Sequence, residues 1–230
     1  MLIHLHIGID KAGSSAIQSN MKINRDWFHE NGVFIPKTGL TTTGYWGVFR
    51  DLSDQSFTKL HEELSHAQHY GFAQAFMSWE GINTYSEKQI ELLWCHLERY
   101  KIKIYVYVRE QSEIIQSGYF QQVKTGQQRH LLSEFFHDNS LLCPDIRNYA
   151  SMLDRFVKAF GKESISVRVF DRTLLKEGNV VVDMLDMLRL EADEDFKLSP
   201  GEENLSLDLV SVKILNLLDQ SKEAKYWHNG

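Results

Sequence analysis

The chain opens with LIHLHIGIDKAGSS at residues 2–15, and this stretch decides the predicted fold. A β-type run over residues 2–7 leads into a loop that contains Gly8 and Gly13, and a helical pattern begins at Ser14. In such a loop the main-chain amides and the partial positive charge of the helix N-terminus face an anion. The stretch therefore predicts a strand, an anion-binding loop and a helix.

The position of the lysine separates two classes of phosphate-binding loop. In nucleoside triphosphatases the pattern is G-x-x-x-x-G-K-[ST], with the lysine after the second glycine. Here Gly8 and Gly13 have that spacing, but Ser14 occupies the lysine position and Lys11 lies between the glycines. The alternative for this stretch is a glycine turn followed by an N-capping serine, which many strand–helix units contain. A lysine and a pair of serines directly after a strand favour the anion-binding loop.

The composition indicates one soluble globular domain over residues 1–230, with 43% hydrophobic and 24% charged residues. A net charge of −6 argues against a broad nucleic-acid surface. Cys95 and Cys143 have no metal or redox spacing, which favours a reducing compartment. We see no signal peptide, and no apolar run reaches the about 20 residues of a membrane helix. We therefore expect a cytoplasmic protein without a transmembrane segment or a nucleic-acid partner, whose oligomeric state is unknown.

Strand and helix patterns alternate along the chain. Besides residues 2–7, we expect strands at 33–35, 73–78, 102–108 and 165–170. We expect helices at 14–31, 53–69, 86–100, 110–124, 147–160, 179–189 and 206–219, with a short helical piece near 132–137. The alternation predicts an α/β fold of three layers, in which helices flank a central, mostly parallel sheet of about five strands.

Ligands of such sheets bind beyond the carboxyl ends of the strands, and two groups of residues there suit anions. In the first loop, main-chain amides from Asp10 to Ser15 would hold a phosphate or sulfate group, while the Lys11 ammonium stabilises a leaving oxygen. In the second group, Arg109 ends a buried strand and Ser117 follows eight residues later, about two helical turns. A guanidinium and a hydroxyl suit a phosphate monoester, although Arg109 has a nearby acidic residue, Glu110 or Glu113, as an alternative partner.

A third strand end carries Glu80, which we expect to act as the general base on an acceptor hydroxyl or amine. Its alternatives are a surface glutamate and a partner for Lys11. His6 is the competing base, although a histidine in a central strand is more often a hydrogen-bonded core residue. The histidine spacings elsewhere are poor for a metal, so no metal site is expected. Candidate acceptor-binding aromatics are Tyr45, Trp46 and Tyr119.

These strand-end motifs together resemble those of the bacterial sulfotransferases, which have a compact fold similar to that of P-loop nucleoside triphosphatases. The first motif of the family looks like I-H-I-G-x-x-K-T-G-[ST]-[ST]-x-I-Q, and residues 5–18 read LHIGIDKAGSSAIQ. The second is a strand that ends in arginine, here Arg109, with a serine eight residues later, here Ser117, and often a following tyrosine. Weaker similarities are Ser78-Trp79-Glu80, Val169-Phe170-Asp171-Arg172 and Asn204-Leu205-Ser206.

The resemblance implies transfer of a sulfuryl group from 3′-phosphoadenosine 5′-phosphosulfate to a carbohydrate or small-molecule acceptor, leaving 3′-phosphoadenosine 5′-phosphate. It implies no requirement for a metal, and it makes Lys11 and Glu80 the catalytic residues. Arg109 and Ser117 would bind the 3′-phosphate. The 5′-phosphosulfate would be bound by Gly8, Asp10, Lys11, Ala12, Gly13, Ser14 and Ser15.

Two departures from the family pattern bear on activity. Ala12 replaces the usual threonine and removes a hydroxyl near the sulfate. Residues 38–51 contain no histidine, which favours Glu80 as the base. Two alternatives stay open: a small-molecule kinase or nucleotide hydrolase that binds ATP with Mg²⁺, and a degenerate nucleotide-binding protein without turnover.

Overall fold

The computed structural model describes residues 1–41, 44–124 and 148–199. The chain divides into two compact units, Met1–Arg109 with Asn148–Gly201, and Glu110–Arg147 with Glu202–Gly230. The sheet belongs to the first unit, and helix α6 (Gln111–Lys124) belongs to the second. That one domain spans residues 1–230 stays a prediction.

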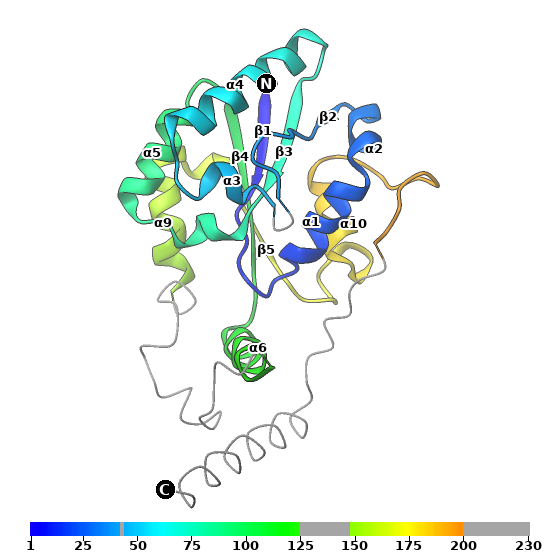
Figure 1. The fold of residues 1–230 in the computed structure, drawn as a ribbon. Helices are drawn as coiled ribbons and strands as arrows, with labels where there is room; N and C mark the ends of the chain where they lie inside the picture. The colour runs from blue at the N-terminus through cyan, green and yellow to red at the C-terminus, as the bar shows by residue number, and fades with distance from the viewer. Residues whose placement is uncertain (42–43, 125–147, 200–230) are drawn as a thin grey trace, which may run out of the picture. The chain divides into compact units, whose positions relative to one another are not determined.

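The core of the first unit is a parallel sheet of five strands in the order β2-β3-β1-β4-β5 (Figure 1). At the end of β1, His6 lies opposite Ser78 of β3 and Tyr105 of β4. The predicted α/β class and the predicted five-stranded parallel sheet are confirmed. The strands are β1 (Leu2–His6), β2 (Val33–Phe34), β3 (Gln74–Ser78), β4 (Lys101–Val108) and β5 (Ile165–Val169).

Helices flank the sheet on both faces and complete three layers (Figure 1). One face carries α1 (Ser14–Ile23), α2 (Arg25–Glu30) and α10 (Val180–Met187). The other carries α3 (Trp46–Phe49), α4 (Asp54–His69), α5 (Glu87–Leu97) and α9 (Tyr149–Phe160). Three short 3₁₀ helices lie between these elements: η1 (Glu80–Thr84), η2 (Lys162–Ser164) and η3 (Lys176–Gly178). Because both faces are covered, β1 is buried on both sides: Ile3 and Leu5 on one face are fully buried, and His4 and His6 on the other are 4% and 0% exposed.

The helix predicted over residues 14–31 is wrong as one element, because the structure breaks it at Asn24. The Asn24 side chain donates to the carbonyl oxygens of Asn20 and Lys197, and its own oxygen accepts from the Lys197 amide. An asparagine side chain that bonds to backbone groups competes with the helical pattern. The two helices still share one apolar face, with Met21 and Phe28 buried.

Helix α5 has one local feature that agrees with its sequence pattern and one that does not. The spacing of Ser86 and Gln89 in the sequence predicts a capping box, and this capping box forms at the start of α5. The apolar spacing of this helix predicts that Trp94 points inward; Trp94 is instead half-buried at the surface, where its ring packs edge-on against Phe160 at 5.3 Å. The predicted elements near 132–137 and 206–219 lie outside the described residues.

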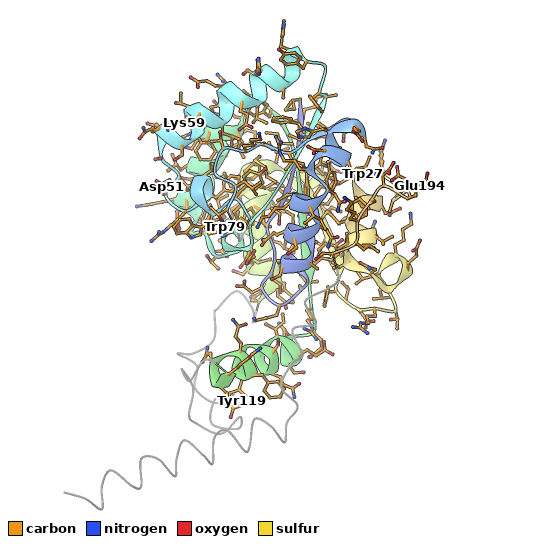
Figure 2. The ribbon with its side chains drawn as sticks, turned by 45° about the vertical axis from the view of Figure 1, so that its right-hand side comes forward. Trp27, Asp51, Lys59, Trp79, Tyr119 and Glu194 are labelled. Carbon is orange, nitrogen blue, oxygen red and sulfur yellow. The ribbon has the colours of Figure 1, made fainter. Side chains whose placement is uncertain are left out.

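Trp27 anchors the segment that follows α10 (Figure 2). Its indole N–H donates to Asp193 at 2.7 Å, and its ring lies 4.8 Å from that of Phe196. The pair fixes a loop with no strand or helix of its own against α2. Across the described ranges, no helix is both long and apolar enough to cross a membrane.

Candidate functional site

The strand order places three loops side by side. Because β1 lies between β3 and β4, the loops that follow these strands meet at one edge of the sheet. The contacts continue past the strand ends: the Trp79 amide donates to the His6 carbonyl at 3.0 Å, and the Tyr107 amide to the Gly8 carbonyl at 2.8 Å. This edge of the sheet therefore holds the N-terminal glycine loop, Glu80 and Arg109.

Two glycines let the first loop approach its neighbours closely. Gly8 has a φ of +104°, and a Cβ there would lie 2.9 Å from both the Glu80 Cβ and the Asn83 Nδ2. Gly13 has a φ of +86°, and a Cβ there would lie 2.8 Å from the Phe170 ring. L-residues with a side chain rarely adopt such angles. The loop backbone is therefore packed against η1 on one side and against the segment after β5 on the other.

Helix α1 starts directly behind this loop with uncapped amides. Gly13 is its N-cap and makes no side-chain cap, so the amides of the first turn lack an acceptor within the helix. The Ser14 hydroxyl donates to the Ile9 carbonyl at 3.0 Å and is buried, whereas Ser15 is exposed. Ala12 is fully buried. The amides and Ser15 are thus open to an anion, while the Ser14 hydroxyl is used to hold the loop.

Charged groups of opposite sign gather around the loop. Lys11 is half-buried with a left-handed φ of 63°. Burial lowers the pKa of its ammonium, and the charges of Asp10 and Glu80 oppose this shift. The pKa of the Asp10 carboxyl is raised, mainly because the surrounding protein excludes water from it and also because of the charge of Glu80. The residue is nevertheless partly exposed. Lys11, Asp10 and Glu80 therefore act on one another electrostatically.

Arg109 lies against the same loop. Its Nη1 donates to the Lys11 carbonyl at 3.0 Å, and its guanidinium carbon lies 5.5 Å from the centre of the Phe170 ring. The Tyr149 hydroxyl donates to the Arg109 carbonyl at 2.7 Å and fixes the backbone at the strand end. The structure thus brings Arg109 to Lys11, two residues that are 98 positions apart.

Ser117 and Tyr119 lie on α6, in the second unit (Figure 2). Tyr119 is buried, with its ring 6.0 Å from that of Phe120. Within this unit, Glu110 accepts hydrogen bonds from the Ser112 hydroxyl and the Glu113 amide. That Ser117 meets Arg109 at a phosphate stays a prediction.

Glu80 is the first residue of η1 and is half-buried. Its Oε2 accepts a hydrogen bond from the side-chain amide of Gln18, and its carbonyl accepts one from Asn83. A residue of α1 therefore hydrogen-bonds to the Glu80 carboxylate, and a residue of η1 hydrogen-bonds to its main chain. No role is assigned to Gln18 from the sequence, although it matches the last position of the first motif and is a polar residue in the inward stripe of α1, with Ser14, Ile17 and Met21.

His6, the competing base, is fully buried at the end of β1. Its Nδ1 is hydrogen-bonded to the Ser78 hydroxyl at 2.7 Å, and its Nε2 has no partner within the described part of the chain. Burial lowers the pKa of His6 to about 3. His6 is thus a neutral core histidine without access to an acceptor.

This burial predicts a pH-dependent stability. The pKa of His6 lies at about 3 in the folded protein and at 6.5 in the unfolded chain. As the pH falls from 6.5 toward 3, the unfolded state therefore gains a proton that the folded state does not. We expect this proton to lower the free energy of unfolding by up to about 1.4 kcal/mol per pH unit.

Urea unfolding between pH 7 and pH 4 measures this slope. His6→Gln, which has no titrating group at that position, should flatten the dependence over this window. Equal slopes for the two proteins would contradict the buried neutral state of His6.

The two aromatic candidates of the loop after β2 differ. Tyr45 is fully buried and its hydroxyl donates to the Pro36 carbonyl, so its assignment as an acceptor-binding residue is corrected to a core residue. Trp46 is 40% exposed, and the guanidinium carbon of Arg50 lies 4.4 Å from the centre of its ring. Helix α3, which carries Trp46, contacts η1, which begins at Glu80. Trp46 therefore stays a candidate for acceptor binding.

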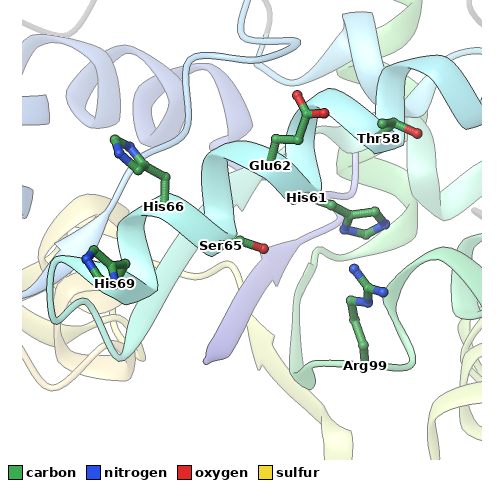
Figure 3. Close-up of a pocket in the computed structure, with 7 residues that line it drawn as sticks. All are labelled: Thr58, His61, Glu62, Ser65, His66, His69 and Arg99. Atoms are coloured by element: carbon green, nitrogen blue, oxygen red, sulfur yellow. The ribbon is translucent and has the colours of Figure 1, made fainter.

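A cavity of about 740 Å³ lies away from these strand ends, along α4 beside Arg99 (Figure 3). No residue of the N-terminal loop lines it, and neither Glu80 nor Arg109 does. In the ranges that the structure describes, no group of three or more His, Cys, Asp or Glu is placed to hold a metal ion. The cavity is lined by Thr58, His61, Glu62, Ser65, His66, His69 and Arg99.

Comparison with solved structures identifies the fold. A sulfotransferase from Alicyclobacillus acidocaldarius aligns over 94% of both chains with a TM-score of 0.54 and 15% sequence identity. The two chains share a fold. The sulfotransferase domain from the curacin biosynthetic pathway aligns over 84% of this chain and 75% of its own, with a TM-score of 0.43 and 12% identity. That second likeness supports no inference.

Comparison by sequence adds little about activity. No family model matches the chain. An uncharacterized protein of Archaeoglobus fulgidus is 32% identical over 120 residues, which are 51% of this chain and 30% of that protein. The match therefore spans less than a third of the relative's length.

Proposed function

We propose that this protein is a sulfotransferase that moves a sulfuryl group from 3′-phosphoadenosine 5′-phosphosulfate to a hydroxyl or amine of a carbohydrate or small-molecule acceptor. The observation that carries the proposal is the meeting of Lys11, Glu80 and Arg109 at one glycine loop. The fold shared with the sulfotransferase from Alicyclobacillus acidocaldarius supports it. A cytoplasmic location is part of the proposal.

The groups at the loop fit the anionic half of such a donor. Gly8 and Gly13 let the loop backbone pack closely against its neighbours, and the first-turn amides of α1 have no side-chain cap. Lys11 and Arg109 add two cations to these donors. N–H groups at a helix N-terminus together with a guanidinium form the donor set that phosphate and sulfate oxygens require.

The proposal gives each residue of the site a chemical role. When bound, the donor supplies an activated sulfuryl group. The loop amides and Ser15 would hold the phosphosulfate, and Lys11 would stabilise the negative charge that develops on the leaving oxygen. Arg109, with Ser117 as its proposed partner, would hold the 3′-phosphate. Glu80 would accept the proton of the acceptor hydroxyl or amine.

Calorimetric titration tests the donor. We expect 3′-phosphoadenosine 5′-phosphate to bind at least about tenfold more tightly than ATP with Mg²⁺, because a guanidinium binds a phosphate monoester by charge-assisted hydrogen bonds. Arg109→Ala should remove most of this preference. Tighter binding of ATP with Mg²⁺ would contradict the proposal in favour of a kinase or nucleotide hydrolase.

Turnover is measured by mass spectrometry of sulfated products on a panel of sugars, phenols and amines, together with release of 3′-phosphoadenosine 5′-phosphate. We expect at least one sulfated product. Binding of the bisphosphate with no sulfated product from any acceptor would indicate a nucleotide-binding protein without turnover.

A further inference from the structure

Gln18 is a buried polar residue on a face of α1 that is otherwise mostly apolar. Its side chain is 3% exposed, and its neighbours on that face, Ile17 and Met21, are 3% and 1% exposed. A buried amide without hydrogen bonds destabilises a fold, so it requires a partner. Gln18 finds this partner in a carboxylate, because its Nε2 donates to the Oε2 of Glu80.

The backbone at Gly44 also lies close to the Gln18 side-chain amide. Gly44 has a φ of +79°, and a Cβ there would lie 3.1 Å from both the Cδ and the Nε2 of Gln18. The same Cβ would lie 2.2 Å from the Ser78 carbonyl oxygen, which accepts a hydrogen bond from the Tyr45 amide. The backbone at Gly44 therefore lies directly against the Gln18 side chain and limits where its amide can turn.

The main chain of Glu80 is fixed by other contacts. Its Cβ lies against Gly8, and its carbonyl accepts a hydrogen bond from Asn83. These contacts place the residue but do not set the direction of its carboxylate. The hydrogen bond that reaches the carboxylate comes from the side-chain amide of Gln18.

We propose that Gln18 is a positioning residue for the proton transfer of the reaction, an inference that rests on the proposed function. By donating to Oε2 it holds the Glu80 carboxylate in one direction and leaves Oε1 to accept from the acceptor. The proton moves from the acceptor oxygen or nitrogen to Oε1, and the electron pair of the broken bond stays on that acceptor atom. Gln18 keeps both of its own amide protons throughout.

Substitutions of similar size separate this role from simple packing. Gln18→Met keeps the approximate volume and removes the donor. Gln18→Glu keeps the shape and replaces the donor with a second carboxyl group beside Glu80, where two like charges disfavour ionisation of both. Asn20→Asp is the matched control, because Asn20 is a buried amide on the same helix that bonds to Ala16 and Ser199 and not to Glu80.

Kinetics with the acceptor from the product screen supply the first readout. We expect Gln18→Met to lower kcat by about 10- to 100-fold, the range for a misplaced catalytic group, with the KM for the donor unchanged within about twofold. Gln18→Glu should lower kcat at neutral pH and move the acid limb of the rate–pH profile to higher pH. Asn20→Asp should leave both kcat and the profile near those of the wild type.

NMR of the Gln18 side-chain amide supplies a readout that needs no turnover. In the wild type its proton signal should shift with pH as the neighbouring carboxylate gains a proton, and Glu80→Gln should abolish this shift. A Gln18 signal that ignores pH in the wild type would overturn the proposed contact and the positioning role with it.

Failure of the positioning role of Gln18 and failure of the proposed function give different results. If the wild type transfers the sulfuryl group and both Gln18 variants keep its rate and its rate–pH profile, the positioning role is overturned and the proposed function stands. No transfer by the wild type, with the pH-dependent amide signal present, overturns the proposed function and reduces the contact between Gln18 and Glu80 to a structural one.

Discussion

Lys11→Ala is expected to lower the rate of sulfuryl transfer by about 10²- to 10³-fold, the usual loss when a donor to a developing negative charge is removed. The side chain is half-buried among the charges of Asp10 and Glu80, at the point of the loop that Arg109 also contacts. Burial lowers the pKa of its ammonium, and the charges of Asp10 and Glu80 oppose this shift. The measurement is kcat with the acceptor from the product screen.

The fold should survive this change. Lys11 occupies a left-handed backbone position with a Cβ already in place, so alanine, which keeps this Cβ, adds no new backbone strain. Lys22→Ala is the matched control: Lys22 is another partly buried lysine whose pKa burial lowers, and it lies in the last turn of α1, away from the loop. A Lys11→Ala protein with wild-type kcat would refute the assignment of Lys11 as a catalytic residue.

Glu80→Gln is expected to lower the rate by about 10²- to 10⁴-fold, which is the typical contribution of a general base. The amide has the shape of the carboxylate, and its oxygen retains an acceptor for the Gln18 side chain, so the packing at η1 should persist. Removal of the Glu80 charge should also lower the raised pKa of Asp10, while the part of that shift due to burial remains. Enzyme kinetics and NMR titration of Asp10 measure the two effects.

The control for this prediction is Glu87→Gln, since Glu87 is an exposed carboxylate that pairs with Lys158 at 2.8 Å on another part of the surface. Asp10→Asn tests a second carboxylate, because Asp10 lies in the same loop and interacts electrostatically with Glu80. Full activity of Glu80→Gln together with loss of activity in Asp10→Asn would transfer the role of base to Asp10.

The sequence alone predicts the strands, most helices and the edge of the sheet where the site lies. These features follow from short-range rules: alternating or continuous apolar runs, the capping box at Ser86, and the glycines of the loop. The break at Asn24 was not predictable, because its cause is a hydrogen bond to Lys197, far along the chain. Tyr45 was assigned to an acceptor surface because aromatic residues in polar loops are often exposed, yet its loop packs down and its hydroxyl bonds to Pro36.

The residue order alone specifies the local chemistry: a strand, a glycine loop with Lys11, a helix start behind it, and separate strand ends at Glu80 and Arg109. Which of these groups are in contact depends on the packing of the sheet. The order β3-β1-β4 makes the three loops neighbours, so that Arg109 reaches the Lys11 carbonyl and Gln18 reaches Glu80. The physical reason is that hydrogen bonds form between atoms within about 3 Å, and residues 62 and 98 positions apart come that close only through the packing of the sheet.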